Sequence, residues 1–150
     1  MAISPVAKKL GIKPEMKALI IAAPAGYVEL LAPLPEGVVV SEVQAGAHQF
    51  VQFFATRKAE IVKAAPKLLK HAAPGALVWI AYPKKTSKLE SDLSREEVWD
   101  AMKNTEWRPV SQIAIDEVWS ALRFRPVKDV KTRGSAALQS RGLRTPTIRG

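Results

Sequence analysis

Ala76-Leu-Val-Trp-Ile-Ala-Tyr82 is the stretch that decides the fold of this 150-residue chain. Turn-forming residues stand on either side of it, Pro74 and Gly75 before and Pro83 after, and its length is that of a strand. Because it has no polar face, such a strand must be buried on both sides, as in parallel sheets that helices cover. Lys17-Ala-Leu-Ile-Ile-Ala-Ala23 has the same character. The two runs therefore predict an α/β layered protein.

Four further runs complete the predicted sheet. Val38–Val40 and Gln49–Ala55 are expected to be short strands beside the first two. Val110–Ile115 and Val118–Arg125 are separated only by two acidic residues, which favours a closing antiparallel hairpin. The predicted fold is a short Rossmann-like three-layer α/β sandwich of about six strands, mainly parallel with a C-terminal antiparallel hairpin, over residues 1–126.

Helices are predicted over residues 4–11, 27–31, 57–65 and 94–103. Thr56 is expected to cap the third helix, and Pro66 to kink or restart it. Ser94 and Glu97 have the spacing of a capping box, in which each side chain binds a free backbone donor of the helix start. Trp99 is expected to be buried by this last helix, which leaves Trp119 as the tryptophan most exposed for stacking or an interface.

The amino-acid composition excludes several kinds of site. The chain has no cysteine and two histidines, so disulfides and thiolate zinc sites are impossible and a metal site is not expected. Neither His48 nor His71 has a serine or carboxylate partner near it in the sequence, so no catalytic triad is predicted. The apolar runs are far shorter than the ~20 residues that span a bilayer, and no signal-peptide pattern precedes them, so a soluble cytoplasmic protein is expected.

The positive charge is concentrated at the C-terminus. Residues 1–122 carry 15 basic and 13 acidic side chains, whereas residues 123–150 carry 8 basic and 1 acidic. Residues 127–150 are expected to form a basic, disordered tail, because they hold few apolar side chains. An acidic protein partner or nucleic-acid phosphates would contact its basic side chains. These are Lys128, Lys131, Arg133, Arg141, Arg144 and Arg149.

The layout resembles a shortened class I methyltransferase. A strand and turn at Ala18–Gly26, a late strand that begins Pro74-Gly75-Ala76, a capped helix and a closing hairpin follow that order. The blocks Tyr82-Pro-Lys-Lys85, Arg108-Pro-Val-Ser-Gln112 and Asp116-Glu-Val-Trp-Ser-Ala-Leu-Arg-Phe-Arg-Pro126 are similar to a bacterial family known only as a domain of unknown function. The resemblance implies a Rossmann-like fold and no established reaction.

If S-adenosylmethionine binds, the resemblance implies that the turn after the first strand and an acid after the second would hold it. The residues at those positions are Pro24, Gly26, Tyr27 and Glu42. The turn has one glycine and a rigid proline, so the cofactor motif is incomplete. The expectation is therefore no cofactor, with S-adenosylmethionine as the alternative.

A second candidate site is the loop after the strand at Ala76–Tyr82. Its three ammonium groups and two hydroxyls suit a phosphate or another anion, although the pattern slightly favours a solvated lysine loop over a specific anion site. The residues are Lys84, Lys85, Thr86, Ser87 and Lys88. Because ligands of such sheets bind beyond the carboxyl ends of the strands, this loop, residues 24–27, Glu42 and Thr56 are expected around one cleft.

Asp116 and Glu117 are adjacent carboxylates between the last two strands. Neighbouring side chains point in different directions there, so an ion pair with Arg108, Arg123 or Arg125 is favoured over acid–base catalysis. No catalytic residue is nominated. The sequence favours a non-catalytic binding or regulatory protein, with a divergent methyltransferase or other small-molecule enzyme, and sequence-independent nucleic-acid binding, as alternatives.

Overall fold

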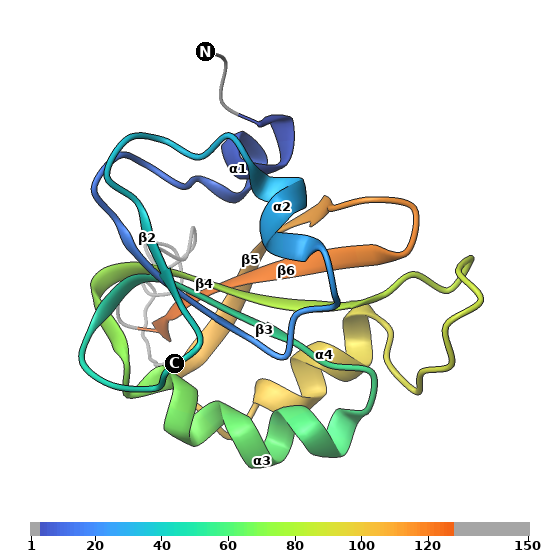
Figure 1. Ribbon diagram of the computed structural model, residues 1–150. Coiled ribbons are helices and arrows are strands. Elements are labelled where there is room, and N and C mark those ends of the chain that lie inside the picture. The colour runs from blue at the N-terminus through green and yellow to red at the C-terminus, as the bar shows by residue number, and fades with distance from the viewer. Residues whose placement is uncertain (1–3, 128–150) are drawn as a thin grey trace, which may run out of the picture.

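The computed structural model describes residues 4–127 as one α/β sandwich (Figure 1). Its elements are α1 (Pro5–Leu10), β1 (Lys17–Ile21), α2 (Tyr27–Leu31), β2 (Val39–Ser41), β3 (His48–Phe54), α3 (Lys58–Leu69), β4 (Ala72–Pro83), α4 (Arg95–Met102), β5 (Trp107–Ala114) and β6 (Trp119–Pro126). The predicted tail at 128–150 lies outside the described residues, so its assignment as a separate segment stays a prediction. No helix of residues 4–127 is long and apolar enough to cross a membrane.

The six strands form one sheet in the order β2-β1-β3-β4-β6-β5. The pairs β1–β2, β1–β3 and β3–β4 are parallel, and β6 pairs antiparallel with both β4 and β5. The predicted fold class is confirmed, including the four parallel strands and the C-terminal hairpin. β1 and β4 are buried along most of their length because each lies between two other strands and helices cover both faces.

Each face of the sheet has its own core. α1 and α2 cover one face, where Leu10, Tyr27 and Trp119 pack over β1, β3 and β4. α3 and α4 cover the other, where Ile61, Val98 and Met102 pack over the same strands (Figure 1). The period of two along each strand divides its side chains between the cores: Phe50 and Phe54 face α1 and α2, and Val51 and Phe53 face α3 and α4.

The residues around Ser4 explain why α1 begins there. Ser4 Oγ accepts a hydrogen bond from the backbone N–H of Ala7 at 3.3 Å, with Pro5 at the first helical position. Gly11 ends the helix in the left-handed conformation with a φ of 85°, which L-residues with a side chain rarely adopt. The Trp79 indole on β4 then donates to the carbonyl of Leu10 at 3.0 Å, which fixes α1 on the sheet.

The predicted break at Pro74 and Gly75 is wrong. β4 begins at Ala72 and includes both residues, because the pairing with β3 shifts there: His48 pairs with Ala72 but Phe50 with Leu77. The extra β4 residues bulge out of the ladder, where a proline interrupts no regular pairing. α3 continues through Pro66, so the helix does not restart there, and a kink at Pro66 stays a prediction. The carbonyl that loses its donor is that of Val62, whose residue is 53% exposed, so water can replace the bond.

Candidate functional site

The carboxyl ends of the parallel strands meet at one edge of the sheet. From β1 the chain crosses to β2 on one side, and from β2 it returns past β1 to β3 on the other. Rossmann-like sheets bind ligands in the crevice outside such a switch in strand order. The structure therefore brings three predicted segments to this edge: residues 24–27 after β1, Glu42 after β2 and Thr56 after β3. We call the part of the edge that these segments form the strand-end crevice.

Tyr27 does not face a ligand space. It is 3% exposed, and its hydroxyl donates to Gln52 Oε1 at 2.8 Å inside the core under α2. Its ring meets Phe54 edge to face at 4.6 Å between centroids, and Phe54 meets Trp119 in the same way at 5.0 Å. Burial is the main cause that raises the pKa of Tyr27 above its ordinary value of 10.0, so the phenol stays neutral. The three rings are therefore part of the buried core on this face of the sheet.

Gln52 is a residue that sequence reasoning missed. It is completely buried among apolar neighbours, and its Nε2 has no hydrogen-bond partner within the described residues. An unsatisfied buried donor of this kind costs about 1–3 kcal/mol. The signal in the sequence was a single amide inside the apolar run Phe50–Phe54. Its role here is to hold the Tyr27 hydroxyl.

The other predicted cofactor residues are more exposed. Pro24 is half-buried and its carbonyl accepts from the N–H of Tyr27 at 3.1 Å, which forms the turn into α2. Gly26 caps that helix in the left-handed conformation with a φ of 84°. Glu42 is exposed just past the edge strand β2. The turn and the acid thus lie at the same edge of the sheet.

The start of α3 also lies at this edge, and three of the backbone donors there are occupied. Glu60 Oε1 accepts from the N–H groups of Thr56 at 2.9 Å and Arg57 at 3.0 Å. Asp92 Oδ1 accepts from the N–H of Lys58 at 2.8 Å. The predicted Thr56 cap is wrong, since Arg57 is the capping position. Glu60 of α3 itself and Asp92 of the loop before α4 accept from the backbone donors around it. Three backbone donors that could bind an anion at this helix start, those of Thr56, Arg57 and Lys58, are therefore already used.

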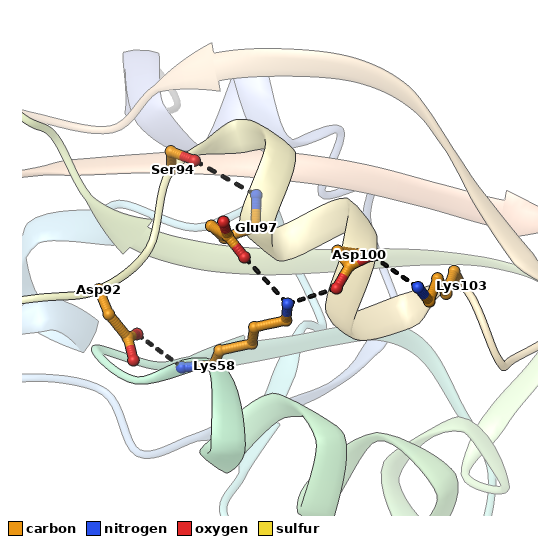
Figure 2. Close-up of polar contacts among 6 residues, drawn as sticks. All are labelled: Lys58, Asp92, Ser94, Glu97, Asp100 and Lys103. Atoms are coloured by element: carbon orange, nitrogen blue, oxygen red, sulfur yellow. Dashed lines mark hydrogen bonds and ion pairs between the residues drawn. The ribbon is translucent and has the colours of Figure 1, made fainter.

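Lys58 joins α3 to α4 (Figure 2). Its ammonium contacts Glu97 Oε1 at 2.9 Å and also Asp100, which Lys103 contacts at 2.9 Å from the other side. Hydrogen bonds from Lys58 and Lys103 lower the pKa of Asp100, and the same bond to Asp100, followed by that to Glu97, raises the pKa of Lys58. The predicted capping box is therefore half right: Ser94 Oγ accepts from Glu97 N–H at 3.2 Å, but the Glu97 carboxylate turns to Lys58.

The lysine loop follows β4 and projects beyond the sheet (Figure 1). Lys84 donates its backbone N–H to the Val118 carbonyl at 2.7 Å, and its own carbonyl accepts from the Ser87 hydroxyl at 2.8 Å. The Ser87 hydroxyl thus closes a turn in the loop. Lys85, Thr86 and Lys88 are exposed. The predicted anion contacts of this loop stay a prediction.

Asp116 closes the β5–β6 turn. Its Oδ1 accepts from the N–H groups of Val118 at 2.9 Å and Trp119 at 2.8 Å, which replaces the glycine that hairpin turns usually need. The predicted ion pair with an arginine is wrong. Arg108 instead donates to the carbonyls of Thr105 and Trp107, both at 2.8 Å.

The tryptophan assignments are reversed. Trp119 is 9% exposed and packs on Phe54, whereas Trp99 is 51% exposed on α4. Trp99 lines a hollow of about 240 Å³ between α4 and the hairpin, together with Arg95, Glu96, Pro109 and Leu122. Leu122 on β6 is 1% exposed and forms its floor. We call this hollow the α4–hairpin groove.

The two histidines lie together at the opposite edge, where the parallel strands begin. The N–H of His48 donates to the carbonyl of His71 at 2.7 Å, and His71 Nδ1 lies 2.8 Å from the carbonyl of Gly46. Burial, followed by the charges of His71 and Lys17, lowers the pKa of His48. Residues 4–127 contain no group of three or more side chains placed to hold a metal ion.

Comparisons with known proteins support the fold. The sequence matches no family model, and no curated protein is significantly similar to it, so the resemblance to a bacterial family stays a prediction. Solved structures do match. A methyltransferase described as S-adenosylmethionine-dependent, from Aquifex aeolicus, has a TM-score of 0.56 at 15% identity and covers 79% of this chain and 86% of its own.

Two further structures agree. The ribosomal protein L11 methylase of Lactobacillus delbrueckii has a TM-score of 0.54 at 9% identity and covers 81% of this chain and 74% of its own. An O-methyltransferase family 2 protein of Planctomyces limnophilus has a TM-score of 0.59 at 10% identity and covers 82% and 57%. At these identities the likeness shows a class I methyltransferase-like fold and nothing more.

Proposed function

We propose that this chain is a non-catalytic binding protein built on a methyltransferase-like fold. One observation carries the proposal: at the strand-end crevice, the N–H groups of Thr56, Arg57 and Lys58 are bound by Glu60 and Asp92 of the chain itself. A ligand that bound the start of α3 would have to displace these carboxylates. Tyr27, one of the expected cofactor residues, is buried and held by Gln52. This edge keeps the strand order of a Rossmann-like ligand site, while the polar groups at the start of α3 and at Tyr27 serve folding.

Calorimetric titration of the full chain with S-adenosylmethionine at millimolar concentration tests this proposal. We expect no saturable heat, and the Aquifex methyltransferase run in the same buffer serves as the positive control. Saturable heat would overturn the proposal.

The second candidate is a divergent S-adenosylmethionine-dependent methyltransferase. Its support is that residues 24–27 and Glu42 follow β1 and β2 at the expected edge, and that one similar structure is described as a complex with S-adenosylmethionine. Glu42→Gln is the matched variant for this candidate. If wild-type protein binds the cofactor, loss of the heat in Glu42→Gln would assign Glu42 to the ribose hydroxyls.

The basic residues after Val127 indicate the class of partner that the protein would bind. Residues 128–150 carry six basic side chains and one acidic, and we propose that they engage an acidic protein. Full-length protein and an Arg141→Gln/Arg144→Gln/Arg149→Gln variant would be titrated with a glutamate-rich peptide and with duplex DNA at two salt concentrations. Weaker peptide binding by the variant supports the proposal. Much tighter binding of DNA, with a steep salt dependence, would make nucleic acid the partner instead.

A further inference from the structure

The α4–hairpin groove is the place where the described surface offers an aromatic face to a partner. Trp99 stands half-exposed at its side, Leu122 forms an apolar floor and Pro109 of β5 forms the far wall. A tryptophan normally buries most of its large apolar surface, and an apolar hollow of about 240 Å³ is roomy enough for one long side chain.

Two charged side chains line the groove, Arg95 and Glu96, and the carboxylate of Glu96 can pair with a cation. Glu96 forms no ion pair within residues 4–127, whereas Glu97 and Asp100 of the same helix are held by Lys58. A lysine or arginine can lay its methylene stem on the apolar floor and place its charge against the indole face and the carboxylate of Glu96. Arg95 lies at the first position of α4 and repels a cation there, so the charge is directed toward Trp99 and Glu96.

The course of the chain brings a basic segment to this edge of the sheet. β6 ends at Pro126, which pairs with Trp107 at the start of β5, and the N–H of Val127 donates to the carbonyl of Glu106 at 2.7 Å. β5 is the outermost strand, and it contributes Pro109 to the groove. The described part of the chain therefore ends beside the strand that borders the groove.

The segment beyond Val127 has the length and the charge to occupy the groove. It is 23 residues long, with six basic side chains and one acidic. At about 3.3 Å per residue it can extend roughly 75 Å, far more than the distance across a domain of this size. Attachment also gives it an effective concentration of about millimolar, at which even a weak contact is populated.

We propose that residues 128–150 bind back onto the α4–hairpin groove of the same chain, with a lysine or arginine side chain stacked on Trp99 and paired with Glu96. The groove and the acidic partner proposed above then compete for residues 128–150. The partner must displace Glu96 from the basic side chain before it can bind that side chain. This inference goes beyond the proposed function and does not depend on whether the strand-end crevice binds a cofactor.

Paramagnetic NMR on the full chain tests the proposal, and the lack of native cysteine makes single-site labelling clean. A nitroxide on Ser140→Cys should broaden the Trp99 indole signal and the amides of Arg95 and Glu96. The indole of Trp79, on the other face of the sheet, is the internal reference. High salt should reduce the broadening, because the contact is an exposed ion pair.

Charge and ring variants at the groove should change the broadening in opposite directions. In the labelled chain, Glu96→Gln and Trp99→Ala should each weaken the broadening around the groove at least twofold, and Arg95→Gln should strengthen it. Broadening that is equal in all variants would overturn the proposal. So would broadening of isotope-labelled, nitroxide-free protein by spin-labelled copies at the same site, since the segment would then bind a second copy.

Discussion

The strand-end crevice and the α4–hairpin groove are built from similar side chains but differ in what fills them. At the crevice, the buried ring of Phe54 packs against both Tyr27 and Trp119, and the chain's own carboxylates bind the start of α3. In the groove, Trp99 is half-exposed beside Glu96, which forms no ion pair within residues 4–127. Aromatic and polar groups that contact each other stabilise a fold, and the same groups left without partners can contact another molecule.

The largest expected effect separates the two regions by stability. Phe54→Ala removes the ring that joins Tyr27 to Trp119 and should lower the free energy of unfolding by about 3–5 kcal/mol. Trp99→Ala removes a half-exposed ring and should change it by about 1 kcal/mol or less. Urea unfolding of the two variants measures both. Equal losses would mean that the groove is as tightly packed as the crevice.

The hydrogen bond behind the crevice should have an intermediate effect. Tyr27→Phe leaves both polar atoms of the Gln52 amide buried without a partner and should cost about 1–3 kcal/mol. The double variant Tyr27→Phe/Gln52→Leu should recover most of that loss, because no buried polar group is stranded. Urea unfolding of the double-mutant cycle checks this. An additive double variant would show that the bond contributes little.

Alkaline pH probes the same residue. Because burial raises the pKa of Tyr27 above 10.0, the unfolded chain loses the phenol proton before the folded chain does. Stability is therefore fully present below pH 10 and should fall above it, by at most about 1.4 kcal/mol per pH unit for one group. Unfolding measured across this range should be flatter in Tyr27→Phe. An unchanged slope would assign the loss to Tyr82, whose pKa burial also raises.

The smallest effect tests the link between the two regions, since Lys58 begins α3 at the crevice and holds α4 beside the groove. Lys58 lowers the pKa of Asp100 below 3.8, so this pair stabilises the fold above that pH and loses its contribution as the pH falls. Lys58→Met should flatten the acid limb of the stability curve only slightly, because the pair is exposed. Unchanged Trp99 fluorescence would show that the groove persists without it; a blue shift would show that it closes.

Much of the fold was predictable because the spacing of apolar residues and the turn-forming residues determine local structure. The runs at Lys17–Ala23 and Ala76–Tyr82 became central strands, and Gly11 ended α1 as expected. The errors arose where a distant partner decided the outcome. Pro74 and Gly75 joined β4 because β3 offered a shifted register, and the Glu97 carboxylate turned from its own helix start to Lys58.

The candidate site was predicted by position more than by role. Strand order placed Tyr27, Glu42 and Thr56 at one edge, as the alternation of strands and helices implied. Whether Tyr27 faced inward depended on Gln52, 25 residues away in the chain. Trp99 could not be distinguished from Trp119 by spacing, because exposure at the groove depends on how α4 sits against the hairpin.

The most direct test of the central claim is an amide NMR titration of the full chain with S-adenosylmethionine. Our account predicts that the signals of Tyr27, Thr56, Arg57 and Lys58 do not move at millimolar cofactor, because Gln52, Glu60 and Asp92 already hold these groups. Saturable shifts confined to those residues would contradict it and would show that the strand-end crevice is a working cofactor site.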